Sequence, residues 1–291
     1  MMNEPPSDQD RKPRRPHPLE APPTSDASDQ QGGPRPQRVM LHMPVVKPYA
    51  VWVLIGFNAL IYIVVQFLIA DSLQQQEVYQ WAWNNHTAVL QFGEYHRLLT
   101  SMFLHSLDSP FHIVFNMFAL YAIGITVERF FGHTRFLVVY FLGGLTGSIF
   151  SVLLSPADVV SVGASGAVFA IFGAEMVFLY NHRKLFGEMA RTQFRQLVVI
   201  ALLNFAFGIF STLSASGTAI DNWAHIGGFI GGGVITWFIG PILIPRRHPT
   251  QPGALTIEDI NPLNQRYQPL LAYVSVMLLL LLAGTVLARS L

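Results

Sequence analysis

A serine between small residues is the side chain of this sequence best suited to nucleophilic chemistry. Ser165 stands in the run GASG at 163–166. Glycine neighbours let other backbone approach closely and leave a hydroxyl uncovered. Small residues also recur every four positions at Gly166, Ala170 and Ala174, which is typical of a helix-packing face. Taken alone, the run favours packing over catalysis, so its interpretation depends on what other segments contribute.

Two other apolar segments carry polar side chains that could act with a serine. His225 could take the hydroxyl proton as a general base. His112 and Asn116 are four residues apart and share a helical face, where they could stabilise an oxyanion with the Ser165 backbone N–H. The alternative is a structural polar pair between helices. Asp221 is better explained as a helix N-cap than as a third catalytic residue, so the pattern indicates acyl transfer by a Ser-His dyad.

Composition places the chain among membrane proteins. Of its 291 residues, 51% are hydrophobic and 12% charged, whereas soluble domains contain about 25% charged residues. The net charge of +1 argues against nucleic acid as a partner. Cysteine is absent, which excludes disulfides and thiolate metal sites. No H-E-x-x-H motif suggests a zinc peptidase, and we expect neither metal nor cofactor.

Apolar segments long enough to approach a membrane span organise the chain. Backbone at membrane depth must hydrogen-bond internally, so each is predicted to be a helix. The segments are 49–70, 111–127, 134–154, 162–180, 197–213, 222–244 and 270–287. The sequence therefore predicts an all-α polytopic membrane protein.

Four regions follow from this division. Residues 1–45 are proline-rich without apolar periodicity and are predicted to be a disordered cytoplasmic tail. Residues 46–244 form a core of six helices with an outer loop at 71–110. A cytoplasmic linker at 245–269 leads to a seventh helix at 270–291.

The distribution of Lys and Arg predicts the orientation. With a cytoplasmic N-terminus and an outer C-terminus, all 18 of these residues except Arg97 and Arg289 lie inside, as the positive-inside rule requires. The second, fourth and sixth helices then enter from the outer face. At 1.5 Å per residue, their polar side chains lie within roughly 8 Å of that boundary. The list is His112, Asn116, Ser165 and His225.

Between about residues 94 and 235, the motifs together resemble the rhomboid intramembrane serine proteases. They are H-R-x-x-T-x-x-F-x-H at 96–105, H-x-x-x-N at 112–116, E-R-x-x-G at 128–132, GASG at 163–166 and A-H-x-x-G-x-x-x-G at 224–232. Each motif alone is weak, but their order makes the joint match specific. The resemblance implies a six-helix bundle with an additional C-terminal helix. It implies Ser165 as nucleophile and His225 as its base.

The resemblance also implies supporting roles around that dyad. Gly163, Gly166, Gly228 and Gly232 would permit close backbone approach, and Phe169 would offer a ring face to His225. Arg97 would be a buried structural cation of the outer loop, although His96 replaces the usual Trp before it. Glu128 and Arg129 are expected to form a structural pair at the turn after the second helix. We also expect Glu175 to pair with Thr236 between helices.

These observations predict an intramembrane serine endopeptidase that cleaves transmembrane protein substrates near the outer face of the lipid bilayer. The positive-inside pattern and the six-plus-one layout suggest a bacterial plasma membrane. Two alternatives are a membrane transporter and an inactive rhomboid-like substrate-binding protein. A transporter would carry polar groups through the midplane in an inverted repeat, and an inactive relative would have lost Ser165 or His225.

Overall fold

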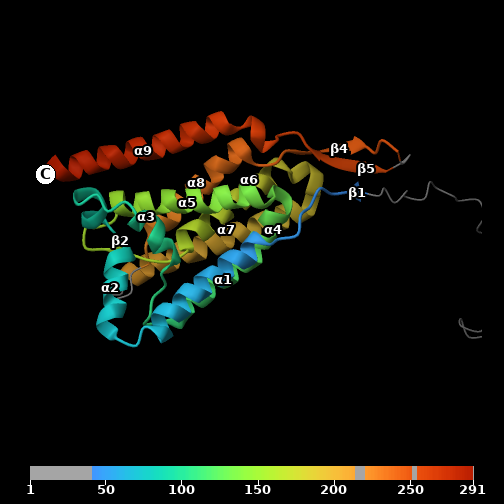
Figure 1. Cartoon of the computed structure of the whole chain (residues 1–291). Coiled ribbons are helices and arrows are strands. Elements are labelled where there is room, and N and C mark those ends of the chain that lie inside the picture. Colours follow the sequence, from blue (N-terminus) through green and yellow to red (C-terminus); the bar gives the residue numbers. More distant parts are fainter. Residues whose placement is uncertain (1–40, 214–219, 251–253, 291) are drawn as a thin grey trace, which may run out of the picture. The chain divides into compact units, whose positions relative to one another are not determined.

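Helices make up most of the computed structural model, which describes residues 41–213, 220–250 and 254–290. The predicted tail therefore lies outside the described residues up to residue 40. All seven apolar segments are helical (Figure 1). They form α1 (Ala50–Ile63), continued by the π-helix η1 (Val64–Leu68), α4 (Pro110–Phe131), α5 (His133–Leu154), α6 (Ser165–Asn181), α7 (Arg183–Leu213), α8 (Asn222–Ile239) and α9 (Tyr267–Ser290). The all-α polytopic class is confirmed.

Length and composition separate these helices into two groups. In the described part of the chain, five helical stretches are long and apolar enough to cross a membrane: Ala50–Leu68, Pro110–Phe131, His133–Leu154, Arg183–Ser211 and Tyr267–Ser290. The apolar helix α6 is shorter, with 17 residues, and α8 is rich in glycine. The two helices that carry Ser165 and His225 are therefore the least typical spans.

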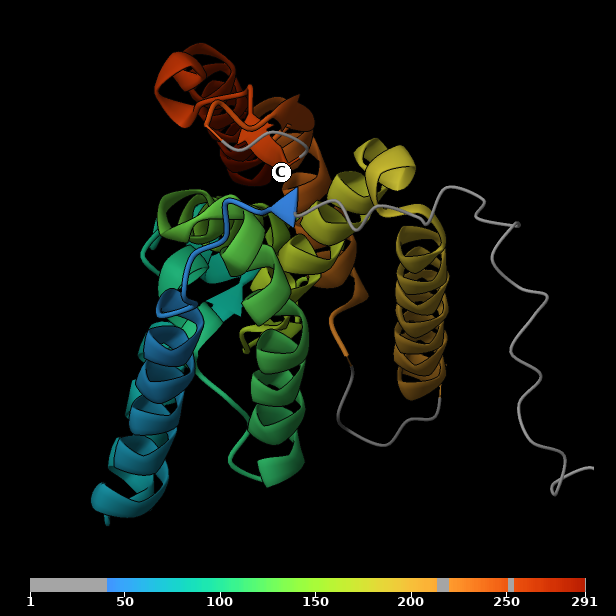
Figure 2. The same ribbon diagram turned by 90° about the vertical axis from the view of Figure 1, so that its right-hand side faces the viewer.

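Local sequence explains where several helices begin and end. Pro110 occupies the first turn of α4, where its missing N–H costs nothing. Gly132 ends α4 with a φ of 76°, a conformation that glycine adopts without strain, and α5 follows at once. The helix expected at 197–213 is longer toward its N-terminus, and the non-helical Gly187 (φ 56°, ψ −128°) separates its long part from a short first segment that begins at Arg183. Leu185 and Phe194, on either side of this break, pack against the core. α7 runs beside the bundle next to α6 (Figure 2).

The centre of the bundle is a crossing of α6 and α8 at backbone distance. A Cβ added to Gly228 would lie 2.0 Å from the Gly166 carbonyl oxygen, and one added to Gly232 would lie 1.9 Å from the Ala170 oxygen. No side chain fits at either position. The close approach expected from the glycine pattern is confirmed, and it brings the first turns of the two helices together.

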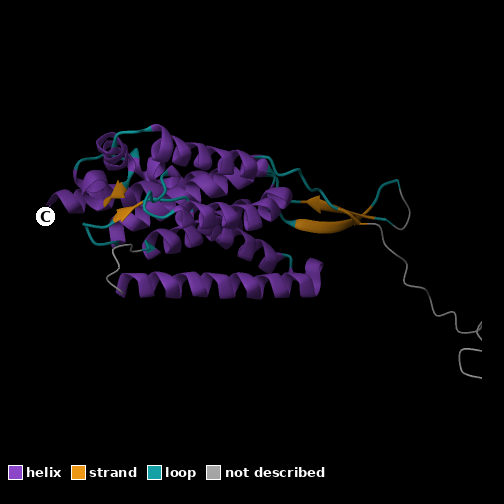
Figure 3. Cartoon of the chain, turned by 90° about the horizontal axis from the view of Figure 1, so that it is seen from below, coloured by secondary structure: helices purple, strands orange, loops and turns teal. Residues whose placement is uncertain are grey.

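A three-stranded sheet is the main departure from the expected architecture. β4 (Leu243–Arg247) and β5 (Leu255–Asp259) form an antiparallel hairpin, and β1 (Leu41–His42) pairs parallel with β5. The segment predicted as a linker at 245–269 is therefore largely structured. Leu243 and Ile257 explain this, because both are buried in the core. A second pair of short strands lies at the opposite end of the bundle (Figure 3).

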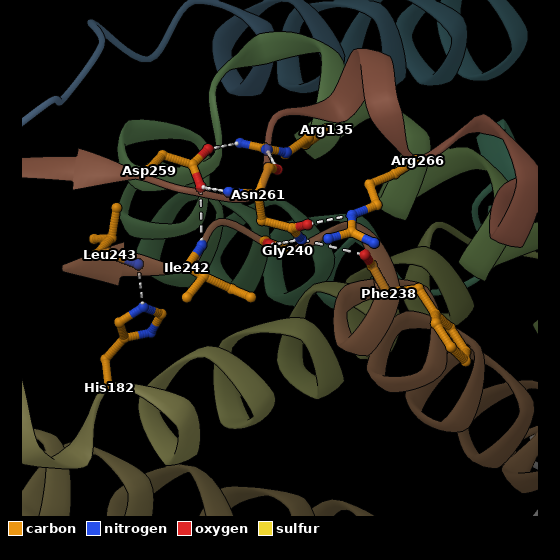
Figure 4. A network of polar contacts seen from close by, with 9 residues as sticks. All are labelled: Arg135, His182, Phe238, Gly240, Ile242, Leu243, Asp259, Asn261 and Arg266. Atoms are coloured by element: carbon orange, nitrogen blue, oxygen red, sulfur yellow. Dashed lines mark hydrogen bonds and ion pairs between the residues drawn. The ribbon is translucent and has the colours of Figure 1, made fainter.

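Two polar side chains fasten the hairpin to the bundle (Figure 4). Asp259 accepts hydrogen bonds from the Ile242 N–H at 2.9 Å and from Arg135 Nη1 of α5 at 2.7 Å. The amide of Asn261 donates to the Gly240 carbonyl at 2.7 Å and to the Phe238 carbonyl at 3.2 Å. Asn261 thus satisfies two carbonyls that the end of α8 would otherwise leave unpaired.

His182 joins the same hairpin to the end of α6. The Leu243 N–H donates to His182 Nε2 at 2.8 Å, so this nitrogen carries no proton. The proton must lie on Nδ1, which donates to the Phe178 carbonyl at 2.7 Å. Burial lowers the pKa of His182, and the hydrogen bond to the Phe178 carbonyl and nearby Asp259 oppose this only in part. The docked hairpin therefore requires a neutral imidazole.

Replacing Gly232 with alanine should test the helix crossing. Gly232→Ala forces a methyl group into the Ala170 carbonyl, so we expect a loss at the upper end of the roughly 1–3 kcal/mol typical of overpacking. Gly233→Ala is the matched control, because its nearest neighbour is an ordinary 3.7 Å away. Thermal unfolding in detergent measures both. Equal stability of the two variants would contradict the crossing.

Acid should loosen the hairpin through His182. Because the pKa is lowered in the folded state from an unfolded value of about 6.5, the stabilisation is complete above roughly pH 6.5 and is lost as the pH falls through the lowered pKa. The loss should reach at most about 1.4 kcal/mol per pH unit. Thermal unfolding from pH 8 to pH 5 should show a steeper decline for wild type than for His182→Gln. Parallel curves would disprove the role of His182.

Candidate active site

Ser165 is the first residue of α6 and is half-buried. Its helix has no side-chain cap, since Ala164 occupies the N-cap position. No capping side chain therefore occupies the first-turn N–H groups of α6, which remain available to another acceptor. A helix N-terminus of this kind attracts negative charge, which suits a site where an oxyanion develops.

Gly163 shapes the approach to Ser165. Its φ is 126°, and its N–H donates to the Ser101 carbonyl at 2.9 Å. A Cβ at this position would lie 2.9 Å from both Cε1 and Nε2 of His112. Glycine is needed here for its conformation and for the space that the His112 ring occupies. The structure therefore places His112 against the segment that leads into Ser165.

Hydrogen bonding fixes which nitrogen of His112 carries the proton. The Ser106 N–H donates to His112 Nδ1 at 3.2 Å, so a neutral ring is protonated on Nε2. This is the nitrogen beside Gly163. His112 can thus present an N–H toward the Ser165 segment without carrying a charge.

Asn116 lies one turn after His112 on α4 and is buried. Its Nδ2 donates to the His112 carbonyl at 2.8 Å. An amide nitrogen has two hydrogens, so one remains for a further acceptor. His112 and Asn116 share one face of α4, as expected.

His225 lies in the first turn of α8 and exposes 7% of its surface. Its ring stacks on Phe169, with centroids 4.3 Å apart and planes inclined by 17°. Phe169 also contacts Phe205 of α7, with centroids 5.4 Å apart. Packing therefore fixes the plane of the imidazole, as the sequence suggested.

The residues next to Ser165 and His225 bring the two side chains into one region. The Ala224 carbonyl oxygen lies 3.4 Å from a Cβ placed on Gly166 and 2.6 Å from one placed on Gly147 of α5. Gly166 follows Ser165, and Ala224 precedes His225. Three helices therefore meet at small residues immediately beside the two proposed reacting groups.

Asp221 is the N-cap of α8. Its Oδ1 accepts from the Ala224 N–H at 3.0 Å and from the Ser155 hydroxyl at 3.4 Å. This confirms the capping role expected from the sequence. Neither Asp221 Oδ2 nor His225 Nδ1 has a hydrogen-bond partner within the described ranges, although both atoms are buried.

Two arginines, Arg97 and Arg289, hold the loop between α1 and α4. Arg97 is buried and binds Glu94 at 2.5 Å and the carbonyls of Gln80 and Trp83. Arg289 of α9 donates to the Leu90 carbonyl at 3.2 Å. Both side chains satisfy outer-loop backbone, and Arg97 has the structural surroundings expected of it.

This loop is connected to the segment before Ser165 by a short pair of hydrogen-bonded strands. β2 (Asn84–Asn85) pairs antiparallel with β3 (Val160–Ser161), which ends two residues before Gly163. Asn84 also donates to the Ser148 carbonyl of α5 at 3.0 Å. The outer loop therefore supports the backbone that enters α6.

Two expected pairs differ in the structure. Glu128 accepts from the N–H groups of Ala50 and Val51 at 2.7 and 2.8 Å and also binds His133, rather than pairing with exposed Arg129. The first N–H groups of α1 have no partner within their own helix, so a buried carboxylate binds them in preference to an exposed arginine. Arg129 contributes its carbonyl, which accepts from Val46 N–H at 3.0 Å.

Glu175 is interhelical, but its partner is Gln193 of α7. Thr236 was expected to be that partner. Its hydroxyl is buried and has no partner in the part of the chain described. The sequence pattern predicted an interhelical contact but could not predict which neighbouring helix faces the carboxyl group.

His105 is a residue near the site to which the sequence assigned no role. It is fully buried, and its ring centroid lies 5.3 Å from that of His112. Burial, with a smaller effect from His112, lowers the pKa of His105 to about 3. It therefore packs as a neutral ring. The one sequence feature that could have drawn attention to His105 is its position at the end of the motif at 96–105.

Comparison with known proteins identifies one family that this chain resembles. The Rhomboid domain model matches residues 92–242. The chain is 42% identical over 140 residues to Rhomboid protease GluP of Bacillus subtilis (strain 168), covering 48% of this chain and 25% of that relative. It is 32% identical over 145 residues to Putative rhomboid protease YdcA of the same organism, covering 50% and 67%.

A third relative, Inactive RHOMBOID-like protein 8 of Arabidopsis thaliana, is 34% identical over 143 residues, covering 49% of this chain and 38% of the relative. The chain thus spans only a quarter of GluP and about two fifths of the plant protein. The matched domain extends from the outer loop through α8 and includes Ser165, His225, His112 and Asn116. Since that domain occupies more than half of its length, this chain is an integral membrane protein of the rhomboid family.

Proposed function

We propose that this protein is an intramembrane serine endopeptidase that uses Ser165 and His225 as a catalytic dyad. The observation that carries the proposal is the contact of α6 with α8. It holds a serine at a helix N-terminus beside a buried histidine whose ring plane is fixed by Phe169. The relatives named as proteases support the same reaction class.

The first step would form an acyl-enzyme. Ser165 Oγ attacks the carbonyl carbon of the scissile peptide while its proton passes to His225 Nε2. The Ser165 N–H, the His112 Nε2–H and the remaining Asn116 N–H would donate to the oxyanion. The proton then moves from His225 to the leaving amine. Water then attacks the ester carbonyl while His225 Nε2 takes one of its protons. His225 returns that proton to Ser165 Oγ as the ester bond breaks and the carboxylic acid product leaves.

The substrate class follows from the location of the dyad. Ser165 and His225 lie at helix ends near the polar outer loop, so the proposed substrates are transmembrane protein segments cleaved near the outer face of the bilayer. Such segments must unwind before attack, which favours sequences with poor helix propensity. In this proposal the N-terminus is cytoplasmic, the C-terminus is outside and the membrane is a bacterial plasma membrane.

An inactive substrate-binding protein is the second candidate, because one relative is named as inactive. Ser165 and His225 are both present, and the small residues next to them pack together, which favours activity. The transporter alternative has less support, because the polar side chains of the site gather at one end of the bundle.

Labelling with a fluorophosphonate probe should test the dyad directly. The probe phosphonylates only an activated serine, so wild-type protein in detergent should be labelled and Ser165→Ala should not. His225→Ala should lose at least about 100-fold in labelling rate, because the general base is removed. Thermal unfolding verifies that each protein is folded. A folded wild type without labelling would favour the inactive, substrate-binding function.

Gly163→Ala should test the contribution of His112. The added methyl overlaps the His112 ring, so the ring must leave its position beside the Ser165 segment. Labelling should then fall by about 100-fold, as when one oxyanion donor is removed. Gly132→Ala is the control, since it has a positive φ of 76° but no neighbour within 4 Å. Both variants should lose roughly 1–2 kcal/mol from backbone strain. Equal labelling rates would remove His112 from the mechanism.

A further inference from the structure

Two complementary polar atoms are buried one helical turn apart without partners. They are Nδ1 of His225 and Oδ2 of Asp221. Leaving a buried donor or acceptor unpaired costs about 1–3 kcal/mol, and native structures contain few such atoms. Two of them at the start of one helix, one able to donate and the other able to accept, call for a common explanation.

The start of α8 brings these groups toward each other. Residues at i and i+4 share a helical face, and helical side chains lean toward the N-terminus. The His225 ring therefore leans toward Asp221, and its own N–H donates to the Asp221 carbonyl at 3.2 Å. Asp221 and His112 are the titratable groups that act electrostatically on the ring.

The cap uses only half of the carboxylate. Both hydrogen bonds that hold Asp221, from the Ala224 N–H and from the Ser155 hydroxyl, end on Oδ1. These bonds fix the orientation of the carboxylate between α8 and the segment after α5. Oδ2 remains available on the buried side. Capping therefore does not exhaust the function of Asp221.

Stacking on Phe169 leaves one property of the base undetermined. A ring that stacks on another keeps its plane when it turns by 180° about its Cβ–Cγ bond, and stacking does not depend on which nitrogen carries the proton. A base that acts through Nε2 needs its proton on Nδ1. Only a hydrogen-bond acceptor at Nδ1 can select both the ring orientation and the tautomer.

We propose that Asp221 is the positioning residue of His225, with Oδ2 accepting the Nδ1–H through a small movement of the carboxylate or one bridging water. This inference rests on the proposed function. During attack, the Ser165 proton passes to Nε2, and the resulting imidazolium keeps its Nδ1–H on the ionised carboxylate. The proton then leaves from Nε2 to the departing amine, and Asp221 stays ionised throughout.

Two substitutions separate positioning from capping. Serine and asparagine both cap helices about as well as aspartate, so Asp221→Ser and Asp221→Asn should unfold at nearly the wild-type temperature. Serine is too short to reach His225. Asparagine can turn its amide N–H toward Nδ1, which favours the wrong tautomer. Fluorophosphonate labelling should therefore slow by about 10-fold in Asp221→Ser and more in Asp221→Asn.

The pH profile of labelling supplies a readout that capping would not move. A neighbouring carboxylate favours the imidazolium, so its loss in either variant should shift the acid limb of the profile to lower pH. Asp71→Ser is the matched control, because Asp71 caps α2 (Ser72–Ala82) by accepting from the Leu73 N–H at 2.9 Å. That variant should label like wild type at every pH.

The outcomes distinguish this inference from the proposed function. If folded wild type is not labelled, the protease proposal fails. If wild type is labelled, His225→Ala is not, and both Asp221 variants keep the wild-type rate and pH profile, Asp221 is only a cap. Slower labelling with a shifted acid limb in both folded variants supports the positioning role.

Discussion

The contact between the α6 and α8 backbones is the constraint on which the rest of this structure depends. A carbonyl oxygen of α6 occupies the place where a side chain of α8 would begin, at both Gly228 and Gly232. Hydrogen-bonded helices held this closely have little freedom to slide. Ser165 and His225 lie beside the contact, so the same glycines that pack the bundle also set the separation of the two proposed reacting groups.

A low-dielectric environment imposes a second constraint, because a buried polar group must be paired and preferably neutral. His112 and His182 meet it in the same way. In each ring, a backbone N–H donates to one nitrogen and so assigns the proton to the other. The His182 proton binds a carbonyl and stabilises the fold. The His112 proton points toward the Ser165 segment, where it can serve chemistry.

The sequence predicted features that depend on local pattern or on residue size. The apolar segments, the glycine crossing, the stacking of Phe169 on His225 and the N-cap Asp221 belong to this group. It could not predict partners chosen by the folded chain. Glu128 binds the N–H of Ala50, 78 residues away, and nothing in either segment indicates the other. The sequence did not predict the β-hairpin, because its segment is rich in prolines and charges. Its two buried positions are also too few to produce a clear alternating pattern.

The helix that carries His225 is held at both ends, and this explains how a short, glycine-rich helix can position the imidazole. At its first turn, Asp221 caps the backbone and accepts the Ser155 hydroxyl from the segment after α5. At its last turn, Asn261 binds the carbonyls of Phe238 and Gly240, and the neighbouring Asp259 binds Arg135 at the start of α5. Both ends of α8 are thus attached to α5 or to the residue that follows it. The β4–β5 hairpin, which was predicted to be a linker, is one of these two attachments. Its polar network therefore helps to hold the helix that carries the candidate site at its other end.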